Sequence, residues 1–470
     1  VMLSESQERM VLTATPGKEA ELIALFERWG LDVAEIGSVA EHGLLRIIER
    51  GEVLGELPVA ALNEPPTYVR TGVEAAAIRA ARLREIGELP EPGDLGRVLL
   101  ELLAAPAIAD KRAVYQQYDH QVMTNTVVLP GRADAAVMRV KGSTLGIAAT
   151  VDCNSRYVYL QPRLGAAHAV AEAARNLSCV GARPLGVTDN LNFGNPTDLS
   201  VYYQLESAVD GIRDACLALG TPVTGGNVSL YNQFRTHGAD GAYAGAEAVH
   251  PTPTIGMVGV LDDVSRHATS DLKAEGEVLL LLGAGRPTLG ASEYLYRVHG
   301  LEAGAPPELD LAAEAALHEA VRTLVATGSC DTAHDVSTGG LAVCLAEMAI
   351  AGAVGARVVV PLGRSRRTDR APALAEALFG ESAGRVVVAV DEDRLNAVLD
   401  LCADLGVLCQ AIGDVGGDRL VVAVGPASHA GPDGAAVAVG TGATPLAPVL
   451  DLDLASLAEA YQSTFAEALG

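Results

Sequence analysis

The sequence is poor in the residue types that mark nucleic-acid-binding proteins. Aromatic residues make up 4% of the chain, tryptophan occurs once, and no run of basic residues is present. Asp and Glu total 59 against 34 Lys and Arg, which gives a net charge of −25. We therefore expect no nucleic-acid partner, and we expect any phosphate-bearing ligand to be bound by local backbone N–H groups and metal rather than by the overall field.

Signals for disulfides, zinc and membranes are also scarce. The seven cysteines form no C-x-x-C pair and most lie in apolar runs, as core thiols do in a reducing compartment. No apolar run approaches the length of a membrane span, and the N-terminus lacks a basic segment followed by an apolar one. These absences predict a cytoplasmic protein with no membrane partner.

A glycine-rich polar segment, 221–232, is the most informative stretch that is present. The spacing of apolar residues predicts a helix over 203–219 that ends at Gly220, and Pro222 then begins a short strand. Gly225 and Gly226 would let the backbone approach a phosphate. Residues 227 and 229, two apart on an extended segment, would project on one side.

Asn227 and Ser229 offer the atoms that a metal and a substrate need. An amide oxygen can complete a Mg²⁺ shell, and a hydroxyl can hold a substrate oxygen. The segment would then be a ligand loop. The alternative is a polar turn at the end of a strand, because Gly-Gly pairs mark many turns.

Two further polar segments have the same double interpretation. Asp189 ends an apolar strand, where it would either meet a ligand or close an Asx turn. Ser337 or Thr338 precedes a helix predicted over 341–351. That position fits an N-cap, and the free N–H groups of the helix could equally hold an anion.

An internal duplication is visible in the sequence. Residues 1–48 match a C-terminal stretch at a constant offset of 376 positions, so that Gly30 lies over Gly406. The match predicts strands near 9–12 and 36–39, with a helix between them. About a hundred residues that resemble a first half precede the second copy and none precede the first, so we expect the chain to begin inside a domain whose N-terminal part is missing.

Several motifs occur together and in one order along the whole chain. They are Ser4-Glu5-Ser6-Gln7-Glu8-Arg9-Met10, Tyr118-Asp119-His120-Gln121-Val122, Asp189-Asn190-Leu191-Asn192-Phe193-Gly194-Asn195-Pro196, Gly226-Asn227-Val228-Ser229-Leu230-Tyr231-Asn232, His334-Asp335-Val336-Ser337 and Phe379-Gly380-Glu381-Ser382. In that combination they closely resemble the synthetase subunit of phosphoribosylformylglycinamidine synthase of the small bacterial type.

The resemblance implies an α+β fold. It is a tandem of barrel-forming and α/β domains of the aminoimidazole ribonucleotide synthetase-like superfamily, with an internal duplication. The expected domains are the C-terminal part of a first α/β domain (1–70, truncated), a helical linker (71–94), a second barrel-forming domain for ATP and substrate (95–272), and a second α/β domain (273–470).

The resemblance also implies an ATP-dependent ligase of purine biosynthesis. Formylglycinamide ribonucleotide would become formylglycinamidine ribonucleotide through an iminophosphate, with ammonia from a glutaminase subunit and with a small accessory subunit in the complex. The cofactors implied are ATP and Mg²⁺. The implied contacts are Glu5, Ser6, Gln7 and Ser229 to substrate, Asp189 and Gly226 to ATP, and Asn227 to Mg²⁺.

One departure from the family pattern is large. The catalytic histidines of the family belong to a domain that would precede Val1, the segment 152–157 contains no histidine, and His334 is interpreted as a packing or turn residue. We therefore assign no catalytic residue and expect the chain alone to be inactive. We also expect self-association, since an unpaired barrel domain exposes a sheet edge.

Two alternatives remain at this stage. The chain could be another ATP-dependent synthetase or kinase of the same superfamily that acts on a different small molecule. It could instead be a non-catalytic fragment that binds nucleotide and assembles with partners.

Overall fold

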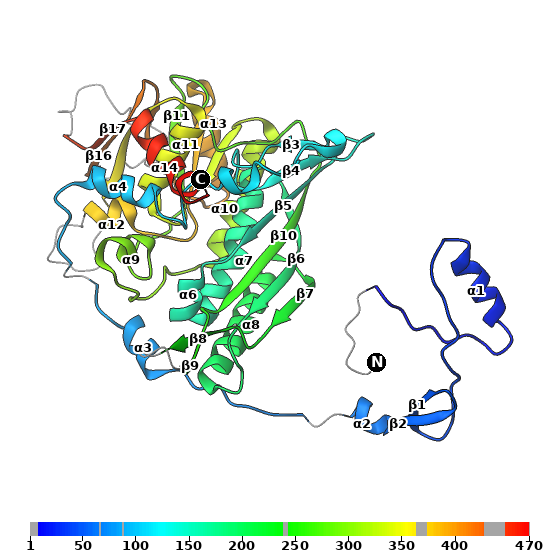
Figure 1. Cartoon of the computed structure of the whole chain (residues 1–470). Coiled ribbons are helices and arrows are strands. Elements are labelled where there is room, and N and C mark those ends of the chain that lie inside the picture. Colours follow the sequence, from blue (N-terminus) through cyan, green and yellow to red (C-terminus); the bar gives the residue numbers. More distant parts are fainter. Residues whose placement is uncertain are drawn as a thin grey trace. The chain divides into compact units, whose positions relative to one another are not determined.

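The computed structural model describes residues 8–64, 67–86, 89–237, 243–362, 374–426 and 447–469 (Figure 1). They belong to two compact units, Val1–Arg70 and Thr71–Gly470. None of the helices within these ranges is long and apolar enough to cross a lipid bilayer.

The N-terminal unit consists of short elements with little core. Its elements are α1 (Glu19–Glu27), β1 (Leu44–Glu49), β2 (Glu52–Pro58) and α2 (Val59–Asn63), with β1 and β2 forming an antiparallel hairpin. None of the described residues of this unit is buried. Large apolar side chains are open to solvent instead, among them Met10, Ile36 and Val39, each more than 80% exposed.

The predicted duplication is visible in the parts of this unit that form locally. Helix α1 starts 376 positions before α13 (Leu395–Asp404), and β1 shifted by the same 376 positions falls within β16 (Arg419–Pro426). Gly30 and Gly406, which follow the two helices, both have φ +69°. The two helices therefore end in the same left-handed turn.

The strands predicted near 9–12 and 36–39 are wrong for this structure. Their counterparts in the C-terminal copy, β14 (Val386–Val390) and β15 (Cys409–Val415), both pair with β11 (Val278–Leu282), which lies between them. No described residue of the N-terminal unit forms a strand in the place of β11. Without that ladder the two segments have no partner for their backbone hydrogen bonds.

A six-stranded sheet organises the first part of the larger unit. Its order is β3-β4-β5-β10-β6-β7, and all neighbours are antiparallel except β6 and β7, which are parallel. The strands are β3 (Thr126–Val128), β4 (Ala136–Arg139), β5 (Gly146–Asp152), β6 (Arg183–Asn192), β7 (Val223–Ser229) and β10 (Thr252–Leu261). A separate hairpin, β8 (Gln233–His237) and β9 (Tyr243–Ala248), follows β7.

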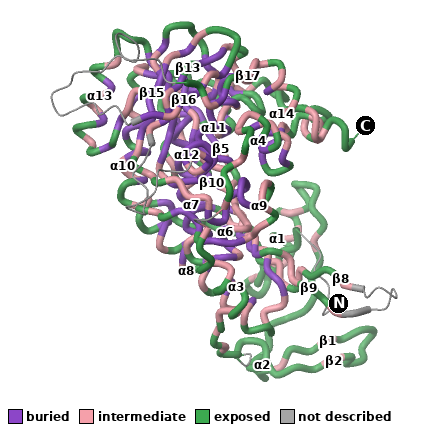
Figure 2. The backbone as a smooth tube through the Cα atoms, turned by 90° about the vertical axis from the view of Figure 1, so that its left-hand side faces the viewer, coloured by how far each residue is buried: buried purple, intermediate pink, exposed green. Residues whose placement is uncertain are grey.

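Helices α7 (Pro162–Cys179) and α8 (Leu199–Leu219) cover one face of this sheet (Figures 1 and 2). Helix α7 is rich in alanine and buried over most of its length, because it packs between the sheet, α8 and α10 (Leu311–Thr327). The predicted helix 203–219 is confirmed, with an earlier start. Asp198 caps it by accepting a hydrogen bond from Ser200 N–H, and Gly220 ends it at φ +68°.

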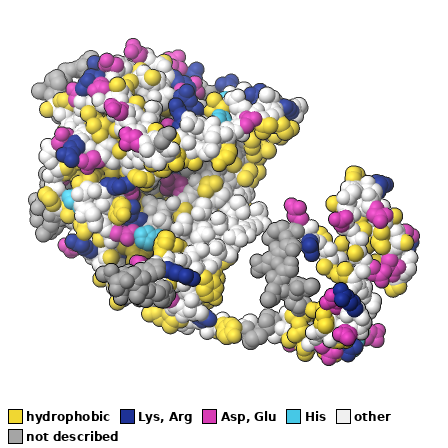
Figure 3. Space-filling model, in the orientation of Figure 1, with side chains coloured by type: hydrophobic (Ala, Val, Ile, Leu, Met, Phe, Trp, Pro, Cys, Tyr) yellow, Lys and Arg dark blue, Asp and Glu magenta, His cyan; other side chains and the backbone are white. Residues whose placement is uncertain are grey.

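The opposite face of the sheet, called the open face below, is exposed. Along β10, residues 253, 255, 257 and 259 are buried on the helix side, while Val258 on the open face is 44% exposed. Met138 and Val151 are exposed on the same face. In Figure 3, the area around β6 and β7 is mostly white, which marks uncharged polar side chains and backbone, and hydrophobic side chains gather toward β3 and β4.

The second sheet forms the core of the C-terminal part. Its order is β12-β14-β11-β15-β13-β16-β17, with the remaining strands β12 (Thr332–Asp335), β13 (Ala356–Leu362) and β17 (Pro448–Asp453). Valine and leucine, with one alanine, fill β11 and β14, which are buried almost throughout. The other helices of the larger unit are α3 (Ala76–Arg82), α4 (Leu95–Leu103), α5 (Arg112–Tyr115), α6 (Ser155–Leu160), α9 (Glu293–His299), α11 (Gly340–Gly352), α12 (Leu374–Phe379) and α14 (Leu454–Leu469).

Candidate functional site

The polar segment 221–232 lies at the edge of the six-stranded sheet. Its first part is β7, which pairs in parallel with β6 and has no other neighbour among the described strands. The register places Asp189 beside Gly226, Asn190 beside Asn227, and residue 192 beside residue 229. The two polar segments singled out in the sequence are thus neighbours in space.

Close packing explains why position 226 is a glycine. A Cβ atom there would lie 2.1 Å from Asp189 Oδ1 and 2.6 Å from the Asp189 carbonyl oxygen, whereas a Cβ at Gly225 would meet nothing within 4 Å. The carboxylate therefore occupies the space that a side chain at 226 would need. Burial raises the pKa of the Asp189 carboxyl group.

The expectation that Asp189 ends its strand is wrong, since β6 continues to Asn192. Val187 and Leu191 are buried on the helix-covered face. Asp189 lies between them at every second position of the strand, so its side chain points to the same face. Burial raises the pKa of the Cys216 thiol in α8 and the Asp189 carboxylate adds to this effect, which supports this placement.

The neighbouring positions point to the open face. Asn190 and Asn192 project from β6 on that side, and Asn227 and Ser229 project from β7 beside them. The predicted ATP-contacting carboxylate and the predicted metal and substrate residues therefore lie on opposite faces of the same two strands.

The predicted substrate tripeptide Glu5, Ser6 and Gln7 lies outside the described residues. Its counterpart in the second copy is well defined. Glu381 is 1% exposed, and its carboxylate accepts hydrogen bonds from Gly339 N–H (3.0 Å), Glu293 N–H (2.8 Å) and the hydroxyl of Tyr157.

Glu381 also lies at the start of the helix predicted over 341–351. That helix is α11, its N-cap is Gly339, and no side chain caps it, so the N-cap role of Ser337 or Thr338 is wrong. An anion does sit at the helix start, and it is the chain's own Glu381 carboxylate. The same carboxylate binds the first N–H group of α9.

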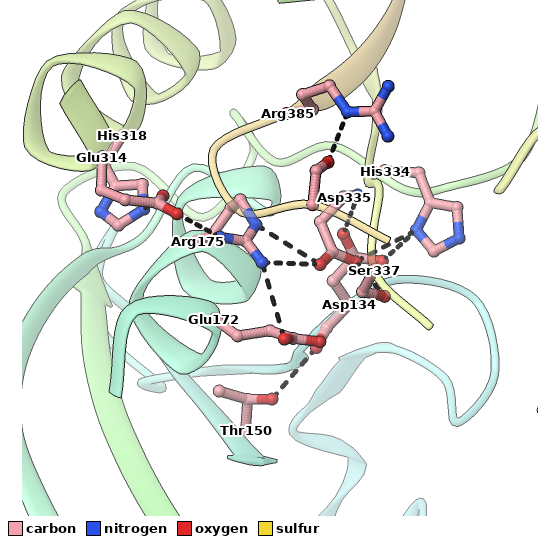
Figure 4. Close-up of polar contacts among 11 residues, drawn as sticks. Asp134, Thr150, Glu172, Arg175, Glu314, His318, His334, Asp335, Ser337 and Arg385 are labelled. Carbon is pink, nitrogen blue, oxygen red and sulfur yellow. Dashed lines mark hydrogen bonds and ion pairs between the residues drawn. The ribbon is translucent and has the colours of Figure 1, made fainter. Parts of the chain in front are cut away.

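A buried cluster of charged residues lies between the two sheets' elements (Figure 4). Arg175 of α7 is at its centre and is 1% exposed. Its guanidinium group donates to Glu314 Oε1 at 2.7 Å, and its Nη2 lies 3.4 Å from Asp335 Oδ2 and 3.7 Å from Glu172 Oε2. Burial of an unpaired guanidinium would be costly, and these three carboxylates compensate for it.

His334 occupies the other side of this cluster, on β12, where it is no turn residue. Its Nδ1 lies 2.5 Å from Asp134 Oδ1 and its Nε2 lies 3.2 Å from Glu347 Oε2. These carboxylates raise the pKa of His334 although its burial acts in the opposite direction. Asp134, His334 and Asp335 place one ligand atom each within 4.8 Å of one another, close enough to share a metal ion.

Carboxylates outnumber cations in the cluster, and the pKa values of several of these carboxylates are raised. Burial raises the pKa of Asp152 to about 7 and that of Asp335 to about 6, and neighbouring carboxylates add to both effects. Burial also raises the pKa of Glu172. Glu314 behaves differently: Arg175 and His318 lower its pKa to about 2 against the effect of burial.

No sequence pattern predicts this cluster as a whole. Its members come from β5, β12, α7, α10, α11 and the segment before β4, and only His334 and Asp335 belong to a common motif. One signal was present: Glu172 and Arg175 stand three apart inside an alanine-rich helix whose other residues are mostly small or apolar. Charged residues within such a helix need partners from elsewhere in the fold.

Comparison with known proteins places this architecture in a family. The family model "AIR synthase related protein, N-terminal domain" matches residues 132–261, and "AIR synthase related protein, C-terminal domain" matches residues 1–49 and 274–425. The chain belongs to the AIR synthase related family. The C-terminal model matches both copies of the duplicated segment, so the expected fold class with its internal duplication is confirmed.

The curated relatives identify the branch of the family. Phosphoribosylformylglycinamidine synthase subunit PurL of Deinococcus radiodurans is 55% identical over 433 residues, which are 91% of this chain and 56% of that protein. PurL of Moorella thermoacetica is 48% identical over 90% of this chain and 55% of its own length. The resemblance drawn from the motifs is confirmed, and the chain spans about half the length of these relatives.

Solved structures share the fold at low sequence identity. PurL of Thermotoga maritima complexed with FGAR has a TM-score of 0.56 at 18% identity, covering 78% of this chain and 54% of that one. The same protein complexed with ADP has a TM-score of 0.53 at 19% identity, covering 77% of this chain and 52% of that one.

Proposed function

We propose that the chain is part of a phosphoribosylformylglycinamidine synthase synthetase subunit, an ATP-dependent ligase that forms a C–N bond. It would convert formylglycinamide ribonucleotide to formylglycinamidine ribonucleotide, with ammonia supplied by a glutaminase partner in a complex that includes a small accessory subunit. The observation that supports this most is the side-by-side placement of Asp189 with Gly226 and of Asn190 with Asn227 on two parallel strands.

The residues of the open face fit a Mg²⁺ ion. Asn227 Oδ1 accepts no hydrogen bond from any described residue, and an amide oxygen is a ligand that Mg²⁺ accepts. Mg²⁺ commonly takes one or two protein groups and completes its shell with phosphate and water. When bound, it neutralises charge on the phosphoryl group that is transferred.

The chain's own residues position the reactants. Gly226 brings the backbone of β7 close to the nucleotide, and Asp189 contacts it from the neighbouring strand. Ser229 holds an oxygen or nitrogen of the substrate on the open face, two residues beyond Asn227. Glu5, Ser6 and Gln7 complete the substrate contacts. Acceleration in phosphoryl transfer comes mainly from such positioning, and we assign no catalytic acid or base to this chain.

The expectations about assembly and location are part of the same proposal. β7 is an edge strand and the open face is exposed, which supports self-association or association with another part of the enzyme. We expect the reaction to take place in the cytoplasm, where the seven cysteines would stay reduced.

The decisive experiment measures ammonia-dependent ADP release with formylglycinamide ribonucleotide, ATP and Mg²⁺. The chain is assayed alone and then mixed with the segment of the Deinococcus radiodurans relative that it does not match. We expect ATP binding by the chain alone in calorimetry, and ADP release only in the mixture. Absence of nucleotide binding together with an inactive mixture would contradict the proposal, and activity of the chain alone would show that it contains a base.

A further inference from the structure

Each of the two ligand residues on β7 is held by an asparagine. Asn227 Nδ2 donates a hydrogen bond to Asn190 Oδ1 at 3.3 Å, and Ser229 Oγ donates to Asn232 Oδ1 at 3.3 Å. Asn232 is itself fixed, since its Nδ2 donates to the Ser229 carbonyl oxygen at 2.8 Å. The donor group of each ligand residue is therefore directed at a neighbour within the chain.

The backbone around Asn232 shows how firmly this arrangement is built. Asn232 N–H donates to the Phe193 carbonyl oxygen, and Tyr231 N–H donates to that of Gly194, both at 3.1 Å. Tyr231 has φ +64°, a conformation that non-glycine residues rarely adopt. Such backbone persists where surrounding contacts impose it, and here it brings the Asn232 side chain back to Ser229.

These bonds decide which atoms of Asn227 and Ser229 stay available to a ligand. An amide whose nitrogen faces Asn190 points its oxygen the other way, and a hydroxyl whose proton is given to Asn232 keeps its lone pairs. Asn227 and Ser229 thus both present acceptors on the open face. A bare phosphate oxygen, which is also an acceptor, finds no donor at Ser229 and only the second Nδ2 hydrogen at Asn227.

We propose that Asn190 and Asn232 are positioning residues that set Asn227 and Ser229 as acceptors, so that this part of the open face favours a divalent cation or a ligand N–H or O–H group over a bare phosphate. The inference rests on the proposed function and defines the chemistry of its site. The mostly white area around β6 and β7 in Figure 3 agrees with recognition by uncharged groups.

The test uses Mn²⁺ as a spectroscopic substitute for Mg²⁺, titrated into the chain in the presence of a non-hydrolysable ATP analogue and followed by electron paramagnetic resonance. Asn190→Ala frees the Asn227 amide to rotate, and we expect Mn²⁺ affinity to fall about 10-fold to 100-fold, as when other outer partners of metal ligands are removed. Asn190→Asp keeps an acceptor for Asn227 Nδ2, so affinity should stay at least at the wild-type level.

Asn227→Asp tests whether residue 227 acts as a hydrogen-bond acceptor or as a donor toward the ligand. If Asn227 serves as an acceptor, its replacement by Asp offers a second oxygen, and Mn²⁺ binding is retained or becomes tighter. If Asn227 served as a donor to phosphate, the same change would abolish binding. Asn192→Ala is the matched control, because Asn192 lies on the same face and donates to the backbone carbonyls of Asn190 and Thr252; its affinity should change less than threefold.

The outcomes distinguish the inference from the function on which it rests. Wild-type chain that binds no Mn²⁺ with the analogue would overturn both. Wild-type binding with an unchanged Asn190→Ala variant, or with a non-binding Asn227→Asp variant, would overturn the positioning role alone. Far-UV circular dichroism of each variant, with the wild-type spectrum and melting temperature, excludes loss of binding through unfolding.

Discussion

Glu381 offers the sharpest test of how the second copy is held together. Its carboxylate is the common acceptor for the first N–H group of α9, the N-cap N–H group of α11 and the hydroxyl of Tyr157. The substitution Glu381→Ala removes the acceptor of all three donors at once. The three donors come from separate elements, so no single local rearrangement can satisfy them again.

The size of the effect follows from the donors left behind. A buried donor without an acceptor costs about 1–3 kcal/mol, so the loss of the acceptor for three donors in Glu381→Ala should lower the free energy of unfolding by roughly 3–9 kcal/mol. Glu381→Gln keeps one oxygen that can accept from the two N–H groups, and its amide nitrogen can donate to the Tyr157 hydroxyl oxygen. It loses the charge of the acceptor, and we expect a smaller loss of about 1–2 kcal/mol.

The assay must report on the larger unit. Trp29 is the single tryptophan and belongs to the N-terminal unit, so tryptophan fluorescence would follow the wrong part of the chain. Urea unfolding is therefore monitored by far-UV circular dichroism. Glu319→Ala serves as control, because this side chain is 57% exposed and its removal should change stability by less than about 0.5 kcal/mol. A Glu381→Ala variant as stable as this control would refute the reasoning.

Three further predictions concern the buried cluster and the sheet edge. Arg175→Met should destabilise the chain by about 3–5 kcal/mol at pH 7 in urea unfolding, and by less at pH 5, where the carboxylates it neutralised can take up protons. The pKa of Asp152 is about 7 in the fold, above the roughly 3.9 of an unfolded chain, so wild-type stability should fall as pH rises between about 4 and 7; in Asp152→Asn this part of the decline should vanish from the pH profile. Gly226→Ala should weaken calorimetric ATP·Mg²⁺ binding more than about tenfold, because its Cβ meets Asp189, while Gly225→Ala, whose Cβ meets nothing, should stay within about threefold; equal losses would contradict the packing argument.

Local signals explain which parts of the fold could be predicted. Helix α8 and strand β7 can be predicted from the sequence because their signals, the apolar spacing, Gly220 and Pro222, all lie within thirty residues of one another. The strands expected near 9–12 and 36–39 depend on a partner strand between them, as β11 provides for β14 and β15. A strand that exists only by pairing cannot be assigned from its own residues.

The candidate site divides in the same way. Asn227 and Ser229 could be placed on one side of a strand from period-two alternation, and β7 has them there. The pairing of Asp189 with Gly226 required the parallel register of β6 and β7, which no sequence pattern encodes. Arg175, Glu314 and Asp335 meet across 160 positions of chain, and their partnership follows from packing alone.

The position of β7 at the rim of its sheet links two properties of the chain. One row of its backbone N–H and C=O groups faces away from β6, and a strand added there would lie directly beside Asn227 and Ser229. Its side chains would form part of the wall around any bound ligand. Strand addition and ligand binding would then be thermodynamically linked, each strengthening or weakening the other by the same factor. A titration of ligand at rising protein concentration would read that factor directly.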